Sequence, residues 1–241
     1  MATETPTMAT ETIILEQSRA QALRDAESKA VEMFREIGSK LIRAGVSEKQ
    51  ISDEIHQMGK EKYNVRTHWH KRLIRSGPNT LAPFAEQPPD RIIEKGDVLI
   101  IDLGPVFEAW EADFGRTYII ETDDPEKIKL RDALEPMWHK IKAKFSQNPS
   151  MTGGELFEIA KACAAEDGWK WGAHLAGHIV GDFPHERIPK DKITNYVVEG
   201  NDQRMDGVDK KGHKKHWILE VHLRPQHEEY GGFFEQILTV D

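Results

Sequence analysis

Four acidic side chains lie inside otherwise apolar segments of this sequence. With their neighbours they are Asp102 (VLIIDL), Asp113 (EADFG), Glu220 (WILEV) and Glu235 (FFEQI). An acid that is buried without a partner is destabilised by several kcal/mol or becomes protonated, so we expect a cation near these residues. His178 (GHIVG) adds an imidazole. One imidazole and four carboxylates are a ligand set suited to divalent Mn, Fe, Co or Zn.

The spacing of the first two acids favours a shared site. Asp113 follows Asp102 by eleven residues, which allows two neighbouring antiparallel strands to place both carboxylates on one face. Like charges placed so close repel each other unless a cation lies between them, and carboxylates that bridge suit a pair of metal ions. Any one of these acids alone is more typical of a solvent-facing strand position. The complete set predicts two divalent metal ions.

The elements that must position these side chains follow from hydrophobic periodicity. Apolar residues at three- and four-residue steps predict helices over 11–44, 47–63, 125–145 and 152–167. Apolar runs bounded by turn residues predict strands over 73–75, 98–103, 106–110, 114–120, 216–223 and 231–240. The three consecutive runs between 98 and 120 are typical of an antiparallel meander. A glycine-punctuated stretch from 168 to 181 carries His178.

Two segments have no apolar period. Residues 1–10 predict a disordered N-terminal arm, and the polar residues 187–215 predict a lid or insertion. Residues 11–241 then form a single domain, which agrees with the chain length of 241 residues.

Composition excludes several classes of protein. A formal net charge of −8 argues against non-specific binding to nucleic acid or to an anionic membrane. The single cysteine, Cys163, excludes an intramolecular disulfide and a zinc site built from cysteines, and is typical of a reducing compartment. The sequence has no apolar run of about 20 residues and no secretory signal at its start. We therefore expect a cytoplasmic protein without nucleic-acid or membrane partners.

Several segments carry a family resemblance. They are Ser76-Gly77-Pro78-Asn79, the run 95–104 (KGDVLIIDLG) around Asp102, 113–117 (DFGRT), 177–186 (GHIVGDFPHE), and the late acids Glu220 and Glu235. In these segments the chain resembles the pita-bread metallopeptidases, which include methionine aminopeptidases, Xaa-Pro aminopeptidases, Xaa-Pro dipeptidases and creatinases. The motifs are most similar to those of the Xaa-Pro peptidase branch.

The resemblance implies an α/β (α+β) pita-bread fold, a curved antiparallel sheet with helices on its outer face and two metal ions on its inner face. By resemblance, Asp102 and Asp113 hold one metal ion, His178 and Glu220 hold the other, and Asp113 and Glu235 bridge them. Homodimers are also a family-level expectation.

The resemblance also implies catalytic roles. Metal ions lower the pKa of bound water, so a nucleophile forms at neutral pH, and Glu220 is expected to move its proton. His185 matches the family's second histidine, which contacts the substrate or the tetrahedral intermediate. The alternative for His185 is an ordinary loop histidine.

The sequence departs from the family where a histidine is expected near the substrate. Phe84 occupies that position and can neither donate a hydrogen bond nor move a proton. His68 and His70 lie upstream and either substitute for the missing histidine or lie on the surface. His222 and Arg224 share a strand face with Glu220, so they either reach the substrate or meet solvent.

These residues leave three functions open. The first is a dinuclear metal-dependent hydrolase of a small amide or short peptide, with an Xaa-Pro-type peptide as the first substrate. The second, suggested by Phe84, is a metal-dependent lyase or a hydrolase of a non-peptide small molecule on the same fold. The third is a metal-free binding module, which the retained acids argue against.

Overall fold

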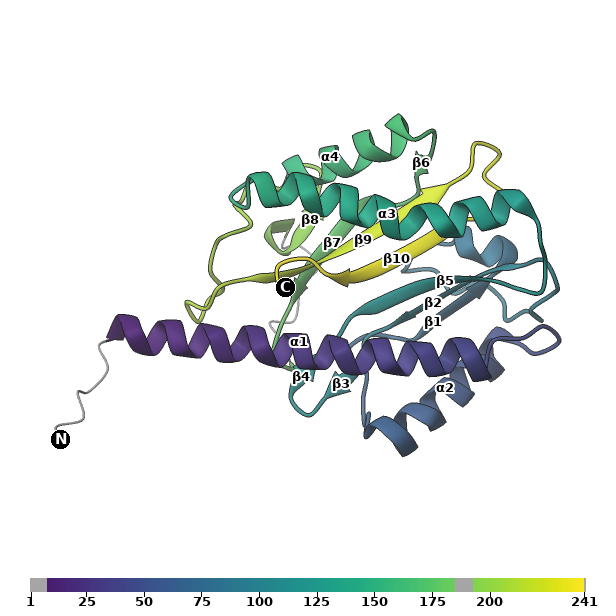
Figure 1. The fold of residues 1–241 in the computed structure, drawn as a ribbon, viewed down its shortest axis with the longest axis horizontal. Coiled ribbons are helices and arrows are strands. Elements are labelled where there is room, and N and C mark those ends of the chain that lie inside the picture. Colours follow the sequence, from purple (N-terminus) through teal and green to yellow (C-terminus); the bar gives the residue numbers. More distant parts are fainter. Residues whose placement is uncertain (1–7, 185–192, 241) are drawn as a thin grey trace.

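A computed structural model describes residues 8–184 and 193–240 of the chain (Figure 1). Its main element is a curved sheet of eight antiparallel strands. Seven strands follow one another in the spatial order β1 (Leu73–Ser76), β2 (Val98–Leu103), β5 (Phe114–Ile119), β10 (Gly232–Ile237), β9 (His216–Arg224), β7 (Leu175–Val180) and β8 (Tyr196–Val198). The eighth strand, β6 (Lys170–Trp171), pairs with β9.

Within the described residues, four α-helices pack against this sheet. They are α1 (Met8–Lys40), α2 (Glu48–Tyr63), α3 (Pro125–Gln147) and α4 (Gly153–Glu166). Figure 1 shows α1 and α3 as long helices running across the sheet, with α2 beside the first and α4 beside the second. In the described part of the chain, none of the helices has the length and apolarity needed to cross a membrane.

Local sequence signals explain where these helices begin. Ser47 caps α2 by accepting a hydrogen bond from the Gln50 backbone N–H. Thr152 and Glu155 form a reciprocal capping box at the start of α4. Such caps satisfy backbone donors that have no partner within the helix, and each stabilises it by about 1 kcal/mol.

Alternation along the strands separates the helix-covered face from the opposite face. In β9, Trp217, Leu219, Val221 and Leu223 belong to the apolar core formed with α3 and α4. Glu220 and His222 alternate with Leu219, Val221 and Leu223 and therefore point to the other side of the sheet. In β2, Leu99, Ile101 and Leu103 pack in the core around α1 and α2. The same alternation places Asp102 on the side away from the helices.

The expected meander is wrong in its connections. Strand β2 pairs directly with β5, and the two strands between them, β3 (Val106–Phe107) and β4 (Trp110–Glu111), form a separate hairpin. The apolar runs were located correctly, but the short turn at Gly104-Pro105 opens a side hairpin. The expectation that two neighbouring strands carry Asp102 and Asp113 holds in a modified form, because Asp113 lies immediately before β5.

The structure describes only part of the polar segment 187–215, which was expected to be a lid or insertion. Residues 185–192 lie outside the described part, but β8 extends the sheet and the side chains of Asn195, Val197, Asn201 and Met205 are buried. The described residues 193–215 are therefore packed against the sheet. Their buried apolar residues are too widely spaced in the sequence to give the hydrophobic repeat of a helix or strand. At the other terminus, α1 begins at Met8, so residues 8–10 of the expected disordered arm are helical.

Candidate metal centre

A row of paired positions crosses four neighbouring strands on the face away from the helices. Asp102 of β2 lies opposite Gly115 of β5, Gly115 lies opposite Glu235 of β10, and Glu235 lies opposite Glu220 of β9. Directly paired residues of antiparallel strands project to the same face, so three acids point to one side. The sheet register therefore brings together residues that are up to 133 positions apart in the sequence.

Glycine at position 115 is required by close packing. A Cβ atom there would lie 2.1 Å from Cε1 of Phe233 and 3.2 Å from Cβ of Glu235. Any larger residue would push Phe233 or Glu235 away, because real Cβ atoms do not approach other atoms so closely.

Asp113 and His178 complete the set predicted from the sequence. The Nε2 atom of His178 lies 3.2 Å from Oδ2 of Asp113 and 3.7 Å from Oε1 of Glu220. Asp102, Asp113, His178, Glu220 and Glu235 are all buried, with exposed fractions from 2% to 8%. The structure thus brings all five predicted residues together. We call them, with His70 described next, the carboxylate–histidine cluster.

His70 joins this cluster from the segment that leads into β1. Its Nε2 atom lies 3.0 Å from Oδ1 of Asp113 and 3.5 Å from Oδ1 of Asp102. Sequence reasoning treated His70 and His68 alike, because alternation aims both to the same side of an extended segment. The structure separates them: the backbone bends at 69–70, and His68 instead forms an isolated bridge with Pro105 and lies near His56.

Crowding of these groups shifts their pKa values in opposite directions. Burial raises the pKa of Asp102 to about 7, with further increases from Asp113 and Glu220. Burial also raises the pKa of Glu235 well above its usual range, with help from Asp113 and Asp102. For Asp113 the two histidines outweigh burial and lower the pKa to about 2.

The histidines respond to the same field. Burial alone would lower the pKa of His70, but the charges of Asp102 and Asp113 raise it to about 9. Burial is likewise outweighed at His178, where Asp113 and Glu220 raise the pKa to about 9. The cluster therefore has an excess of negative charge that attracts protons or other cations.

The donor set fits metal ions. Two groups of three residues each place one ligand atom per residue within 4.8 Å of the others: His70, Asp102 and Asp113 in one group, and Asp113, His178 and Glu235 in the other. Within the described residues, Oδ1 of Asp102 and Oε2 of Glu235 are buried and form no hydrogen bond. Buried carboxylate oxygens without a donor are expensive, and a divalent cation would neutralise them.

The Arg-Thr pair after Asp113 has a structural role. Strands β5 and β10 share a single paired position, Glu235 with Gly115. Beside it, Arg116 donates to the carbonyl of Glu235, and Thr117 both donates to the carbonyl and accepts from the N–H of Phe233. These side chains replace ladder hydrogen bonds and hold Glu235 at its place in the row.

The Ser-Gly-Pro-Asn motif also lies outside the cluster. Ser76 and Asn79 both donate to the buried carboxylate of Glu48 at the start of α2. Gly77 adopts φ +51°, a left-handed conformation that favours glycine. The motif thus turns the chain after β1 and ties it to α2.

The residues predicted to bind substrate have different positions. The Nε2 atom of His222 lies 2.9 Å from Oε2 of Glu220, so His222 adjoins the cluster. Arg224 donates to the carbonyl of Leu81 and lies 3.7 Å from the carboxylate of Glu228, outside the cluster. Phe84 is 52% exposed, and the centroid of its ring lies 6.0 Å from that of His70. The predicted catalytic residue His185 lies outside the described residues.

Sequence reasoning missed Trp69. Its ring makes edge contacts with both imidazoles, at centroid distances of 4.6 Å to His70 and 5.1 Å to His178. Its Nε1 donates to the carbonyl of Ala112, next to Asp113. The position of Trp69 next to His70 was the only signal in the sequence that it lies near the site. A single tryptophan in a loop does not show which side of the chain its ring faces.

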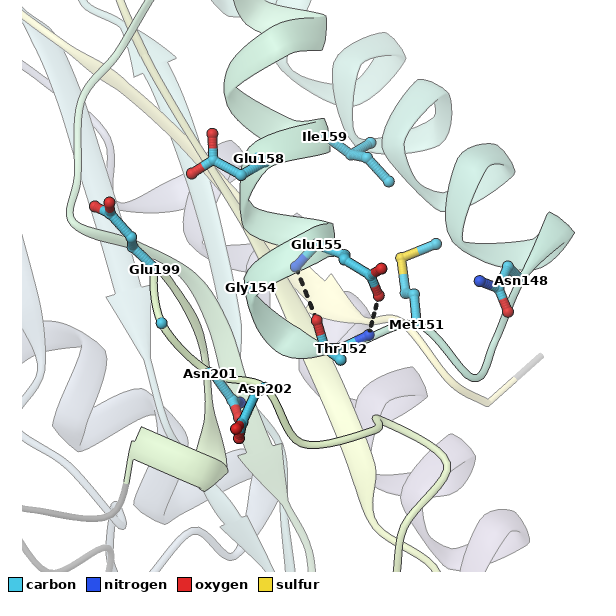
Figure 2. Close-up of a pocket in the computed structure, with 11 residues that line it drawn as sticks. Asn148, Met151, Thr152, Gly154, Glu155, Glu158, Ile159, Glu199, Asn201 and Asp202 are labelled. Carbon is cyan, nitrogen blue, oxygen red and sulfur yellow. Dashed lines mark hydrogen bonds between the residues drawn. The ribbon is translucent and has the colours of Figure 1, made fainter.

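A separate surface cavity of about 730 Å³ lies between the start of α4 and the segment after β8 (Figure 2). Figure 2 shows Glu155 and Glu158 of α4 on one side and Glu199 and Asp202 on the other. None of its lining residues belongs to the carboxylate–histidine cluster.

A curved antiparallel sheet with helices on one face and a buried set of acids and histidines on the other defines the pita-bread class of proteins. The chain belongs to metallopeptidase family M24, whose family model matches residues 21–208. This membership confirms the resemblance that the motifs indicate.

Individual relatives are distant. An Xaa-Pro dipeptidase of Pyrococcus horikoshii is 27% identical over 169 residues, which are 67% of this chain and 47% of that protein. An Xaa-Pro dipeptidase of Lactobacillus helveticus is 25% identical over 168 residues, 69% of this chain and 43% of that protein. The chain therefore spans about half the length of the curated relatives it matches.

Solved structures support the pita-bread fold. A prolidase from Thermococcus sibiricus superposes with a TM-score of 0.70 at 19% identity. The superposition covers 92% of this chain and 56% of the prolidase chain. A methionine aminopeptidase from Thermotoga maritima reaches 0.68 at 16% identity and covers 93% of this chain and 97% of its own.

Proposed function

We propose that this protein is a dinuclear metal-dependent hydrolase of a small amide or short peptide, with Xaa-Pro peptides as the first substrate class. The observation that carries this proposal is the convergence of Asp102, Asp113, Glu220 and Glu235 on one buried face, with His178 among them. Membership of the family and relatives named Xaa-Pro dipeptidase support the choice of substrate.

The residues divide the work of holding two divalent ions of Mn, Fe, Co or Zn. Asp102 and Asp113 would hold one ion and His178 and Glu220 the other, with Asp113 and Glu235 between them. When bound, such ions lower the pKa of water toward 7 and polarise a carbonyl group.

The remaining side chains orient the reacting groups. His222 contacts one oxygen of Glu220 and restrains the rotation of that carboxylate, which is suited to move a proton during the reaction. The ring of Phe84, beside His70 and 4.7 Å from the ammonium of Lys71, offers an exposed apolar surface to a substrate side chain. Arg75 donates to the carbonyls of Ala82, Pro83 and Glu86 and so fixes the loop that carries Phe84.

A second candidate keeps the metal ions and changes the reaction. Phe84 cannot bind a substrate amine or amide as a histidine would, which favours a lyase or a hydrolase of a non-peptide small molecule. Product analysis in oxygen-18 water separates these reactions, because hydrolysis incorporates the label into the product and elimination does not.

The decisive experiment compares metal content in the wild type and in Glu235→Ala, purified without chelator or affinity nickel. We expect about two transition-metal ions per chain in the wild type and a loss of metal and of turnover in the variant. The matched control is Glu229→Ala, whose side chain is 78% exposed. A wild-type protein that contains no metal, and that takes up none when Mn, Fe, Co or Zn is added, would overturn the proposal and favour a binding module.

A homodimer and a cytoplasmic location stay predictions. Light scattering of the purified protein measures the first, and fractionation of the source cells measures the second.

A further inference from the structure

We propose that His70 is an additional metal-binding residue, so that each of the two metal positions receives one imidazole. This inference rests on the proposed function and extends its ligand set from five residues to six. The five motif residues supply a single imidazole, that of His178. With His70, both positions would have mixed nitrogen and oxygen ligands.

The two histidines approach Asp113 from its two oxygens. Nε2 of His70 lies 3.0 Å from Oδ1, and Nε2 of His178 lies 3.2 Å from Oδ2. Each imidazole also faces a second acid: His70 is 3.5 Å from Asp102, and His178 is 3.7 Å from Glu220. Asp113 therefore lies at the centre of two equivalent arrangements, each made of one histidine and one further carboxylate.

The rings of both histidines are held in the same way. Nδ1 of His70 lies 2.7 Å from the carbonyl oxygen of Lys71, and Nδ1 of His178 lies 2.8 Å from that of Ile179. A carbonyl oxygen accepts only, so in each ring Nδ1 carries a hydrogen, and Nε2 is the nitrogen that would bind a metal ion after losing its proton to it. Metal-binding histidines almost always donate their second ring nitrogen to a carbonyl or carboxylate in this way.

The surrounding residues leave room for the His70 ring. A Cβ atom at Gly104 would lie 2.3 Å from Cδ2 of His70 and 2.5 Å from Nε1 of Trp69. The Trp69 backbone N–H donates to the carbonyl of Gly104, and the Trp69 side chain contacts both imidazoles. Gly104 thus allows the segment before β1 to approach the end of β2, where Asp102 lies.

Phe84 explains why this histidine comes from a different segment. The family resemblance predicts a histidine at position 84, and the phenylalanine found there packs against the ring of His70. The chain thus has an imidazole next to the cluster, but this imidazole comes from residue 70, before β1, and not from position 84, after β1.

X-ray absorption of the cobalt-loaded full chain tests this inference directly. Imidazole scattering counts the histidines bound per metal ion, whether or not the protein turns over a substrate. With two cobalt ions per chain, we expect about one imidazole per cobalt in the wild type and about half of that in His70→Ala. His68→Ala is the matched control, because His68 lies two residues away, bridges to Pro105 and has its ring near His56. It should keep the wild-type count.

Cobalt affinity supplies a second readout. We expect His70→Ala to bind one cobalt ion at least about 10-fold more weakly than the wild type. Loss of a contact that only supports a metal ligand usually weakens binding by this factor, and loss of a ligand should weaken it at least as much. Circular dichroism tests whether the variant is folded. The number of imidazoles per cobalt ion in the wild type tests the proposal even if the variant does not fold.

The outcomes separate this inference from the proposed function. Two cobalt ions with about half an imidazole each in the wild type, together with hydrolysis, would overturn the role of His70 alone. Two cobalt ions with one imidazole each, but no hydrolysis of any peptide or amide, would support His70 and overturn the hydrolase. A wild type that binds no cobalt would overturn both.

Discussion

Glu220 and Glu235 are direct partners across β9 and β10, and both side chains are buried on the same face. Like charges directly opposite each other destabilise a sheet, so this pairing works against the fold. The helix-covered face of the same strands is filled with apolar side chains and supplies the compensating stability. The pairing therefore serves the site and lowers the stability of the sheet.

Glu235→Gln should have opposite effects with and without metal ions. In protein treated with chelator, removing one acid from the crowded cluster should raise the free energy of unfolding by about 1–2 kcal/mol, which is roughly 2–8 °C in Tm. Added Mn or Co should raise the Tm of the wild type and leave that of the variant nearly unchanged. Differential scanning fluorimetry measures both effects. A variant less stable than the chelated wild type would contradict the prediction.

His222→Ala should weaken metal binding without unfolding the protein. His222 holds one oxygen of Glu220 at 2.9 Å, and loss of such a supporting contact usually reduces metal affinity or activity about 10- to 100-fold. Isothermal titration with cobalt measures the affinity. His227→Ala, on the exposed loop after β9, is the control and should bind as the wild type does. Equal affinities for all three proteins would remove His222 from the site.

Thr117→Val should destabilise the junction between β5 and β10. The substitution keeps the shape of the side chain but leaves the N–H and carbonyl of Phe233 without their partner. We expect a loss of about 1–3 kcal/mol in the free energy of unfolding, measured by denaturant titration. Thr67→Val replaces an exposed threonine and should change stability by less than about 0.5 kcal/mol. If the two variants are equally stable, the side-chain bridge contributes nothing.

Glu27→Gln should change how stability depends on pH. Burial raises the pKa of Glu27 to about 7, although its carboxylate accepts a hydrogen bond from the Ile237 N–H and lies near Arg116. A group whose pKa is higher in the folded state stabilises the fold fully below its unfolded pKa, near 4.5, and this contribution is lost as the pH rises through 7.

The glutamine keeps the acceptor oxygen and removes the titration. The variant should therefore match the wild type near pH 4.5 and exceed its free energy of unfolding by about 1–3 kcal/mol at pH 8.5. Urea unfolding at both pH values measures the difference. Parallel pH profiles for the two proteins would show that Glu27 titrates normally.

Much of the molecule follows from local sequence. Periodicity located the four α-helices and the longer strands within a few residues, because a buried helix face and a buried strand face have different repeats. Acids inside apolar runs marked Asp102, Glu220 and Glu235, since a buried charge requires a partner nearby. Strand β7 was missed, because the glycines around His178 resemble a loop.

Tertiary structure alone decided which residues meet. The row from Asp102 to Glu220 exists because β2, β5, β10 and β9 pair in one register, and register depends on contacts between segments far apart in the chain. His68 and His70 are equivalent in an alternating pattern, and the bend at 69–70 brings only the second to Asp113. Local periodicity reports which face a side chain takes, whereas the neighbours on that face are set by how distant segments pack.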